Sequence, residues 1–88
     1  MIQIIVANTD TTHDLFATVT DLNTSPASVV LNGQRINHGT QTPVNVQEDG
    51  NGNCLVNIDC VNADDSTNVK SFPNQVTQAN GTISVDVF

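Results

Sequence analysis

The chain has few of the residues from which exposed helices and aromatic binding sites are built. It contains no Trp and no Tyr, and only three Phe. Glu48, Lys70 and Arg35 are the sole residues of their types. Because Glu, Lys, Arg and Ala usually form exposed helix faces, we expect no helix longer than one turn. The chain is rich instead in Val, Ile, Thr, Asn and Asp, which favour strands and the turns between them.

The chain also has little positive charge. Two basic residues stand against nine acidic ones, which gives a formal net charge of −7. A protein that binds nucleic acid or an anionic membrane needs Lys and Arg to neutralise phosphate groups, so neither partner is expected. Cations, neutral ligands such as glycans, and other proteins are the partners that this charge allows, and solubility alone also explains it.

A long apolar run is missing as well. No stretch approaches the roughly 20 apolar residues of a membrane span. Met1 leads directly into the strand-like sequence of residues 2–6, without the basic start of a signal peptide. These features are consistent with a cytoplasmic protein, with export by a route that leaves no cleaved signal, or with the mature form of a processed protein.

Short segments of alternating apolar and polar residues recur along the chain, separated by turn sequences. Residues 2–7 begin this pattern and residues 82–88 end it. Alternation with a period of two is typical of strands with one buried and one solvated face. The pattern predicts strands at residues 2–7, 14–21, 28–31, 43–47, 54–61, 67–72 and 82–88.

About seven such strands predict an all-β fold, a small antiparallel β-sandwich with immunoglobulin-like or Greek-key connections and residues 1–88 as one domain. The number and spacing of the strands resemble small immunoglobulin-like sandwiches, although the Trp and the tyrosine corner of true immunoglobulin domains are missing. Asn32-Gly33 is the strongest hairpin signal, because a type I′ turn needs positive φ at both central positions. We expect a turn there, followed by a short return strand at residues 34–36.

The two cysteines, Cys54 and Cys60, lie six residues apart in one predicted strand. An extended segment of that length spans about 20 Å, whereas a disulfide needs Cα atoms within about 7 Å. The thiols are therefore expected to be unpaired and buried as small hydrophobic groups, which favours a reducing compartment. Zinc is not expected, because the pair lacks the spacing of zinc ligands.

Acidic and amide side chains are concentrated in the two predicted turns on either side of the 54–61 strand. The candidate ligand-binding residues are Asp49, Asn51 and Asn53 in the first turn and Asp64 and Asp65 in the second. The first turn begins like a calcium loop, but Cys stands where that loop needs Gly and a bidentate Glu. A hairpin turn explains it more simply, so we expect no metal ligand set and no cofactor. A glycan, or Ca²⁺ in a non-standard site, is the ligand that these residues would suit.

Catalytic constellations are weak in this sequence. His13 and His38 are the only histidines, and neither has an evident nucleophile beside it. Adjacent residues of a strand point to opposite faces, so His13 and Asp14 would form a poor dyad.

The sequence therefore favours a non-enzymatic binding or structural module that acts through polar loops or a sheet edge. Unprotected sheet edges invite strand pairing, so the chain is expected to be either a monomer or a homodimer. A lectin-like or Ca²⁺-dependent carbohydrate-binding protein is the first alternative. A small hydrolase that uses His13 or His38 is the second.

Overall fold

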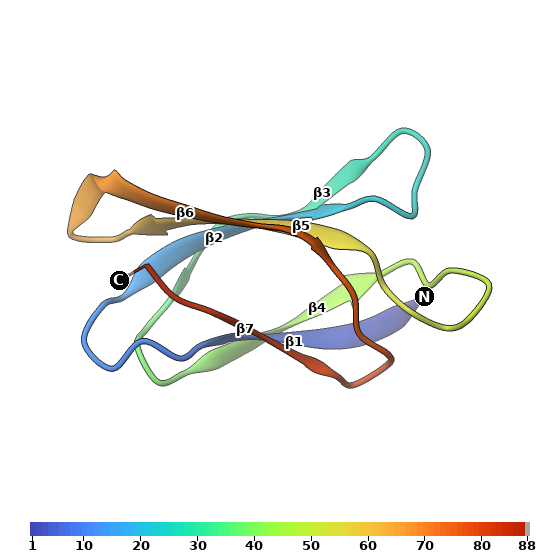
Figure 1. The fold of residues 1–88 in the computed structure, drawn as a ribbon, viewed down its shortest axis with the longest axis horizontal. Helices are drawn as coiled ribbons and strands as arrows, with labels where there is room; N and C mark the ends of the chain where they lie inside the picture. The colour runs from blue at the N-terminus through green and yellow to red at the C-terminus, as the bar shows by residue number, and fades with distance from the viewer. Residues whose placement is uncertain (88) are drawn as a thin grey trace.

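The computed structural model describes residues 1–87, whose strands form two sheets that face each other (Figure 1). These residues form no helix, as the composition predicts. No helix of residues 1–87 is thus long and apolar enough to cross a membrane. The strands are β1 (Ile2–Asn8), β2 (Leu15–Asp21), β3 (Ser28–Ile36), β4 (Gln41–Val46), β5 (Val56–Asn62), β6 (Asp65–Gln75) and β7 (Thr82–Val85).

The two sheets differ in strand direction. The larger sheet has the order β3-β2-β5-β6 and is antiparallel throughout. The smaller sheet has the order β4-β1-β7, in which β1 pairs antiparallel with β4 but parallel with β7. This sheet is mixed, so the prediction of a purely antiparallel sandwich is wrong here. Parallel strands need a long crossover, and the chain between β1 and β7 supplies it by passing through the larger sheet.

The hydrophobic core lies between the sheets and is made by the inward-facing side chains of both. The alternating burial predicted from the sequence is confirmed in β1, β2, β4, β5 and β7, whereas β3 and β6 are exposed along most of their length. The core residues are Ile4, Val6, Leu15, Ala17, Val19, Ile36, Val44, Val46, Cys54, Val56, Ile58, Cys60, Ile83, Val85 and Val87.

The two core cysteines are buried and unpaired, as predicted. Burial raises the pKa of the Cys54 thiol and raises that of Cys60 to about 12. Both thiols are therefore neutral at physiological pH and pack as small hydrophobic groups.

The predicted hairpin at Asn32-Gly33 is wrong, because both residues lie inside the continuous strand β3. Gly33 does adopt the positive φ that the sequence suggests, at +63°. Its N–H donates a hydrogen bond to the Thr18 hydroxyl on β2 at 3.1 Å, and the β2–β3 register shifts on both sides of Val19. The left-handed residue is thus accommodated as an irregularity within a long strand, where pairing with β2 continues on either side.

Other strand boundaries also differ from the prediction. Strand β4 begins two residues earlier and ends one residue earlier than the predicted 43–47 segment, and β5 begins two residues later and ends one residue later than the predicted 54–61 segment. Strand β6 extends two residues earlier and three residues later than the predicted 67–72 segment. Strand β7 ends at Val85, and the predicted last residue of that strand, Phe88, lies outside the described residues.

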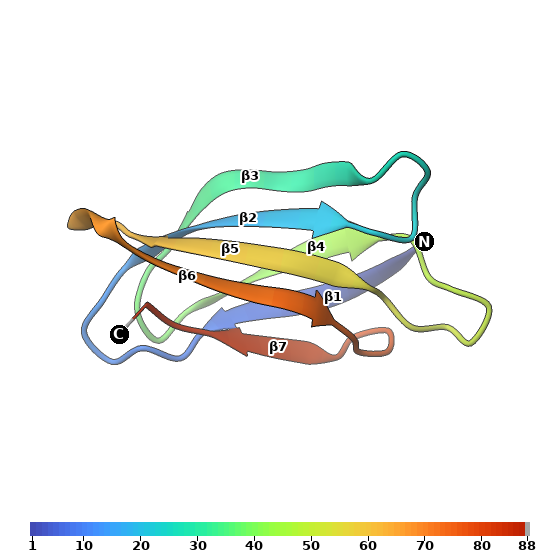
Figure 2. The same ribbon diagram turned by 45° about the horizontal axis from the view of Figure 1, so that its top comes forward.

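The connections gather at the two ends of the sandwich (Figure 2). One end carries the β1–β2 and β3–β4 loops, the β5–β6 turn and the residues that follow β7. The opposite end carries the β2–β3, β4–β5 and β6–β7 connections. We call the first group, residues 9–14, 37–40, 63–64 and 86–87, the Asp10 end.

Candidate functional site

The loop between β1 and β2 is anchored by the side chain of Asn8, which is 1% exposed. Its Nδ2 donates hydrogen bonds to the carbonyl oxygens of His13 at 2.9 Å and Ile36 at 3.0 Å. Its Oδ1 accepts a hydrogen bond from the N–H of Asp10 at 3.0 Å. Asn8 therefore joins both ends of the loop to the end of β3 and determines where Asp10 begins its turn.

Asp10 is the most deeply buried carboxylate of this loop, with a side chain only 2% exposed. Its Oδ1 accepts hydrogen bonds from the backbone N–H groups of Thr12 and His13, both at 3.0 Å, and lies 2.9 Å from His13 Nδ1. Its Oδ2 is buried and has no hydrogen-bond partner among residues 1–87. One oxygen of the carboxylate is thus saturated and the other is left without a donor.

Asp10 is ionised at neutral pH in spite of its burial. Burial acts to raise its pKa, but the hydrogen bonds from Thr12 and His13 outweigh this effect and lower the pKa to about 2. The unpartnered Oδ2 therefore belongs to a carboxylate anion, for which the absence of a donor is most costly.

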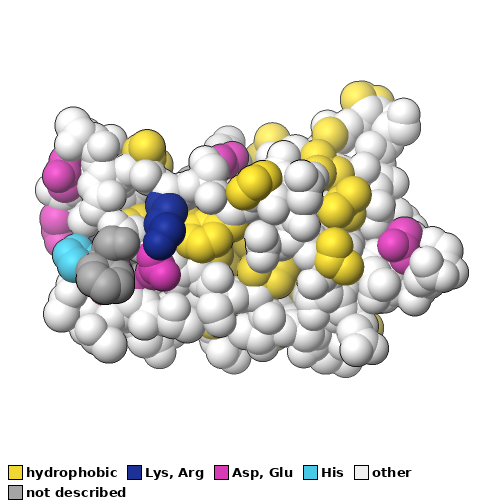
Figure 3. Space-filling view, viewed as in Figure 1, with side chains coloured by type: hydrophobic (Ala, Val, Ile, Leu, Met, Phe, Trp, Pro, Cys, Tyr) yellow, Lys and Arg dark blue, Asp and Glu magenta, His cyan; other side chains and the backbone are white. Residues whose placement is uncertain are grey.

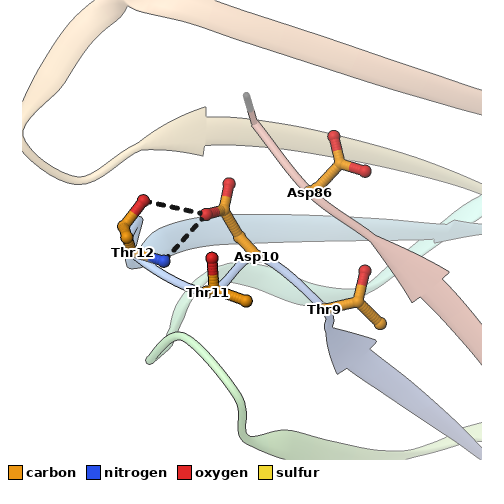
Figure 4. A pocket seen from close by; sticks show the side chains of 5 residues that line it. All are labelled: Thr9, Asp10, Thr11, Thr12 and Asp86. Atoms are coloured by element: carbon orange, nitrogen blue, oxygen red, sulfur yellow. Dashed lines mark hydrogen bonds between the residues drawn. The ribbon is translucent and has the colours of Figure 1, made fainter.

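A hollow of about 320 Å³ lies beside this carboxylate. Its lining residues are Thr9, Asp10, Thr11, Thr12 and Asp86 (Figure 4). In this view the oxygen of Asp10 that makes no drawn bond points to the same side as the hydroxyls of Thr9 and Thr11. Asp86 reaches the hollow from the segment after β7. The β1–β2 loop and the segment after β7 therefore build one site, and the polar side-chain atoms that residues 1–87 contribute to it are all oxygens.

A second acidic centre at the same end joins the β3–β4 loop to the start of β2. Asp14 Oδ1 accepts the backbone N–H of His38 at 2.8 Å and lies 2.7 Å from His38 Nδ1. Arg35 donates from Nη2 to Asp14 Oδ2 at 2.8 Å. The His38 backbone and ring and the Arg35 guanidinium together lower the pKa of Asp14 to about 2. Both oxygens of this carboxylate are engaged, so Asp14 acts as a structural link.

The two histidines do not have the geometry of a catalytic triad. In a triad, one ring nitrogen faces the carboxylate and the other faces the nucleophile. Here the Thr12 hydroxyl at 3.0 Å and the Asp10 carboxylate at 2.9 Å both contact Nδ1 of His13. His38 likewise meets Asp14 through Nδ1. Among the described residues, no hydroxyl group contacts Nε2 of either histidine.

The ligand-binding residues predicted from the sequence lie at opposite ends of the sandwich. Asp49, Asn51 and Asn53 are in the β4–β5 connection, whereas Asp64 and Asp65 are at the other end of β5 (Figure 1). The seven residues of β5 separate the two groups by about 20 Å. The structure therefore does not bring these five residues together around one ligand.

Each of the two turns uses its carboxylate locally. Asp49 Oδ1 accepts backbone N–H groups of Asn53 and Asn51, which lower its pKa. Asp65 accepts the hydroxyl and the N–H of Thr67, with the same effect on its pKa. Within residues 1–87, no three or more His, Cys, Asp and Glu side chains converge as a metal-binding group.

Sequence reasoning missed Asp10 and Asp86 as members of one site. The local signal for Asp10 was present, since an Asp followed by Thr two residues later is typical of a side chain that caps its own turn. The approach of Asp86 had no local signal, because it depends on the parallel pairing of β7 with β1, whose residues are distant in sequence.

Comparison with known proteins gives no match: no protein-family model matches the chain, and no curated protein or solved structure matches it significantly. The site is therefore interpreted from its own geometry and chemistry.

Proposed function

We propose that this protein is a non-enzymatic binding module that acts through the polar loops of the Asp10 end. The observation that carries the proposal is the buried, unpartnered Oδ2 of Asp10 beside an open hollow. Folded proteins satisfy nearly all buried polar atoms, and an exception calls for an ion, a water or a ligand. Because Oδ2 is shielded from solvent, a ligand that enters the hollow must displace the atoms that cover Oδ2 before it can supply the missing interaction.

The histidine geometry supports binding rather than turnover. Both imidazole rings are held at Nδ1 by a carboxylate, and the nearest hydroxyl, that of Thr12, is on the same nitrogen of His13. General-base activation of a nucleophile needs that nucleophile on the free nitrogen. The hydrolase alternative would therefore need a water molecule as its nucleophile and a substrate cleft larger than the hollow beside Asp10.

The size and lining of the hollow favour a small polar ligand. Ligand sites begin at about 300 Å³, and this hollow of about 320 Å³ suits one sugar ring or one hydrated ion. Carboxylate and threonine oxygens accept hydrogen bonds from sugar hydroxyls, which keeps the lectin-like alternative open. The chain lacks Trp and Tyr, so a sugar would bind here without the aromatic platform that lectin sites commonly use.

Titration followed by amide NMR spectra of the ¹⁵N-labelled protein tests this proposal. We would add CaCl₂ and, separately, a panel of monosaccharides, with ionic strength held constant. We expect shifts confined to residues 9–13 and 85–87. Shifts confined to the β4–β5 connection would instead assign binding to Asp49, Asn51 and Asn53. Turnover of a substrate that is lost in the His13→Ala, His38→Ala double variant would refute the non-enzymatic role.

The strand order supports Greek-key connections as the finer description of the fold. Strands β2, β3 and β4 follow one another as neighbours around the sandwich, and β5 then returns to lie beside β2. In immunoglobulin domains the first and second strands share a sheet, whereas β1 here lies between β4 and β7 and β2 is in the other sheet. The order therefore favours the Greek-key alternative over the immunoglobulin-like one.

Pairing of two copies through the β6 edge is a second candidate function. Strand β6 is 11 residues long and has β5 as its sheet neighbour on one side only. Val69 on this strand is 63% exposed and Val76 just beyond it is 59% exposed. Figure 3, in which β6 and β7 face the viewer, shows hydrophobic side chains exposed across the middle of this face. An edge of this kind can pair with its own copy in antiparallel fashion around a two-fold axis.

Analytical ultracentrifugation over a concentration series tests the second candidate. Self-association through β6 predicts a dimer that Val69→Lys dissociates, because Lys blunts an edge strand. A matched change on the other exposed edge, Val29→Lys on β3, should leave the dimer intact. A monomer at all concentrations would contradict this candidate without affecting the proposal for the Asp10 end.

A further inference from the structure

The unpartnered oxygen of Asp10 indicates what kind of group the hollow accepts. Three nitrogens surround Oδ1, at 2.9 to 3.0 Å, so the carboxylate is fixed and cannot turn Oδ2 toward these donors. Oδ2 is shielded from solvent and lacks a donor among residues 1–87. A buried anionic oxygen of this kind is stabilised by a cation or by a strong hydrogen-bond donor.

The other residues that line the hollow distinguish between a cation and a hydrogen-bond donor as the ligand. The polar side-chain atoms are the hydroxyl oxygens of Thr9, Thr11 and Thr12 and the carboxylate oxygens of Asp10 and Asp86. An all-oxygen set with two carboxylates is the environment that hard cations prefer, and Ca²⁺ in particular accepts irregular sets completed by water. Among residues 1–87, no aromatic or basic side chain lines the hollow to hold a sugar ring or an anion. The chemistry of the lining is therefore that of a cation site.

We propose that the hollow between the β1–β2 loop and Asp86 binds a hard cation, with Asp10 Oδ2 and the Asp86 carboxylate as its charged ligands. Hydroxyl oxygens of Thr9 and Thr11 and water molecules complete the set. This inference rests on the proposed binding function and specifies the ligand class of the same site. It concerns residues other than Asp49 and Asp65, whose carboxylates accept hydrogen bonds from their own turns.

Lys70 controls the strength of this site. Its Nζ lies 2.6 Å from Asp86 Oδ1, and Figure 4 shows the Asp86 carboxylate turned away from Asp10. A bound cation must draw this carboxylate away from the Lys70 ammonium, which lowers the affinity. Weak extracellular Ca²⁺ sites have dissociation constants on the order of 0.1–1 mM, and we expect this range here. Removing the ammonium should therefore strengthen binding at this site.

Isothermal titration calorimetry and amide NMR with CaCl₂, at ionic strength kept constant with NaCl, test the proposal on the whole chain. The wild type should bind one Ca²⁺ and shift the amides of residues 9–13 and 85–87. Asp10→Asn keeps an oxygen for the N–H groups of Thr12 and His13 but removes the charge, and should weaken binding at least about tenfold. Asp86→Asn should have a similar effect, and Lys70→Met should tighten binding about threefold.

The matched control is Asp64→Asn. Asp64 is exposed, lies at the same end and contributes the same charge, so its loss should change the affinity less than about twofold. Equal weakening by Asp64→Asn and Asp10→Asn would overturn the proposal, since it would mean diffuse attraction by the net negative charge. If Asp10→Asn does not fold, the Asp86 and Lys70 variants still decide the outcome.

The failure of this inference can be told apart from the failure of the proposed function. Amide shifts in residues 9–13 with a monosaccharide but none with about 10 mM CaCl₂ would overturn the cation assignment and leave the binding function standing. The absence of shifts in these residues with every ligand of the panel would overturn both.

Discussion

Asn8→Ala is the most direct test of how the candidate site is held in place. The substitution removes three hydrogen bonds, two donated to the carbonyl oxygens of His13 and Ile36 and one accepted from the N–H of Asp10. Asn8 is 1% exposed, so water does not replace it without a structural change. At about 1 kcal/mol for each buried hydrogen bond, the free energy of unfolding should fall by about 3 kcal/mol.

Urea denaturation measures this loss. Far-UV circular dichroism is the suitable probe, because the chain has no Trp for fluorescence. With a dependence on urea of about 1 kcal/mol/M for a small domain, the midpoint should move down by about 3 M. In thermal unfolding the same loss lowers Tm by roughly 12–24 °C.

The control for Asn8→Ala is Asn45→Ala, which changes the same residue type at an exposed position of β4. This variant should differ from the wild type by no more than about 0.5 kcal/mol. A loss below about 1 kcal/mol for Asn8→Ala would refute the reasoning, because it would mean that water reaches the freed carbonyl groups. The amide signals of residues 10–13 should also move in Asn8→Ala, since the loop loses its anchor.

Four further predictions concern the core, the backbone, the acidic centres and the thiols. Ile58→Ala, at a fully buried position, should lower the free energy of unfolding by about 3–4 kcal/mol in urea denaturation. A loss below about 1 kcal/mol would place Ile58 outside the core. Gly33→Ala has open space for its Cβ but keeps φ at +63°, so it should cost about 1 kcal/mol from backbone strain alone; no loss in the same assay would mean that β3 relaxes. Folding lowers the pKa of Asp10 and Asp14 to about 2, so the free energy of unfolding should be flat above about pH 4 and fall as the pH drops from about 4 to 2. The Asp10→Asn, Asp14→Asn double variant should reduce this decline. The buried Cys60 thiol should not react with a disulfide reagent until urea unfolds the chain; fast reaction of the native protein would contradict its burial.

The candidate site shows where reasoning from the sequence reaches its limit. The turn at Asp10 could be recognised locally, since Asp followed by Thr two positions later caps its own backbone. The sequence could not show that this turn forms a candidate site, because the hollow beside Asp10 arises where the loop meets the segment after β7. The turn at Asp49 has a more suggestive sequence, yet its carboxylate is used by its own N–H groups. The sequence shows where the acidic side chains lie along the chain, whereas only their packing decides which carboxylate oxygens are left without a hydrogen-bond partner.

The sequence by itself determined the class of structure and the inward faces of β1, β2, β4, β5 and β7. Alternation with a period of two places Leu15, Val46 and Ile58 inside wherever their strands are paired, because a pleated strand always turns alternate side chains to opposite faces. Only the tertiary structure decided which strands pair and in which direction. The period is the same in parallel and antiparallel sheets, so the pairing of β1 with β7 left no mark on either segment. The sequence around Gly33 likewise indicates a positive φ but does not say whether that φ closes a hairpin or interrupts a long strand. The pairing of β3 with β2, and the hydrogen bond from Gly33 to Thr18 on β2, decide between the two.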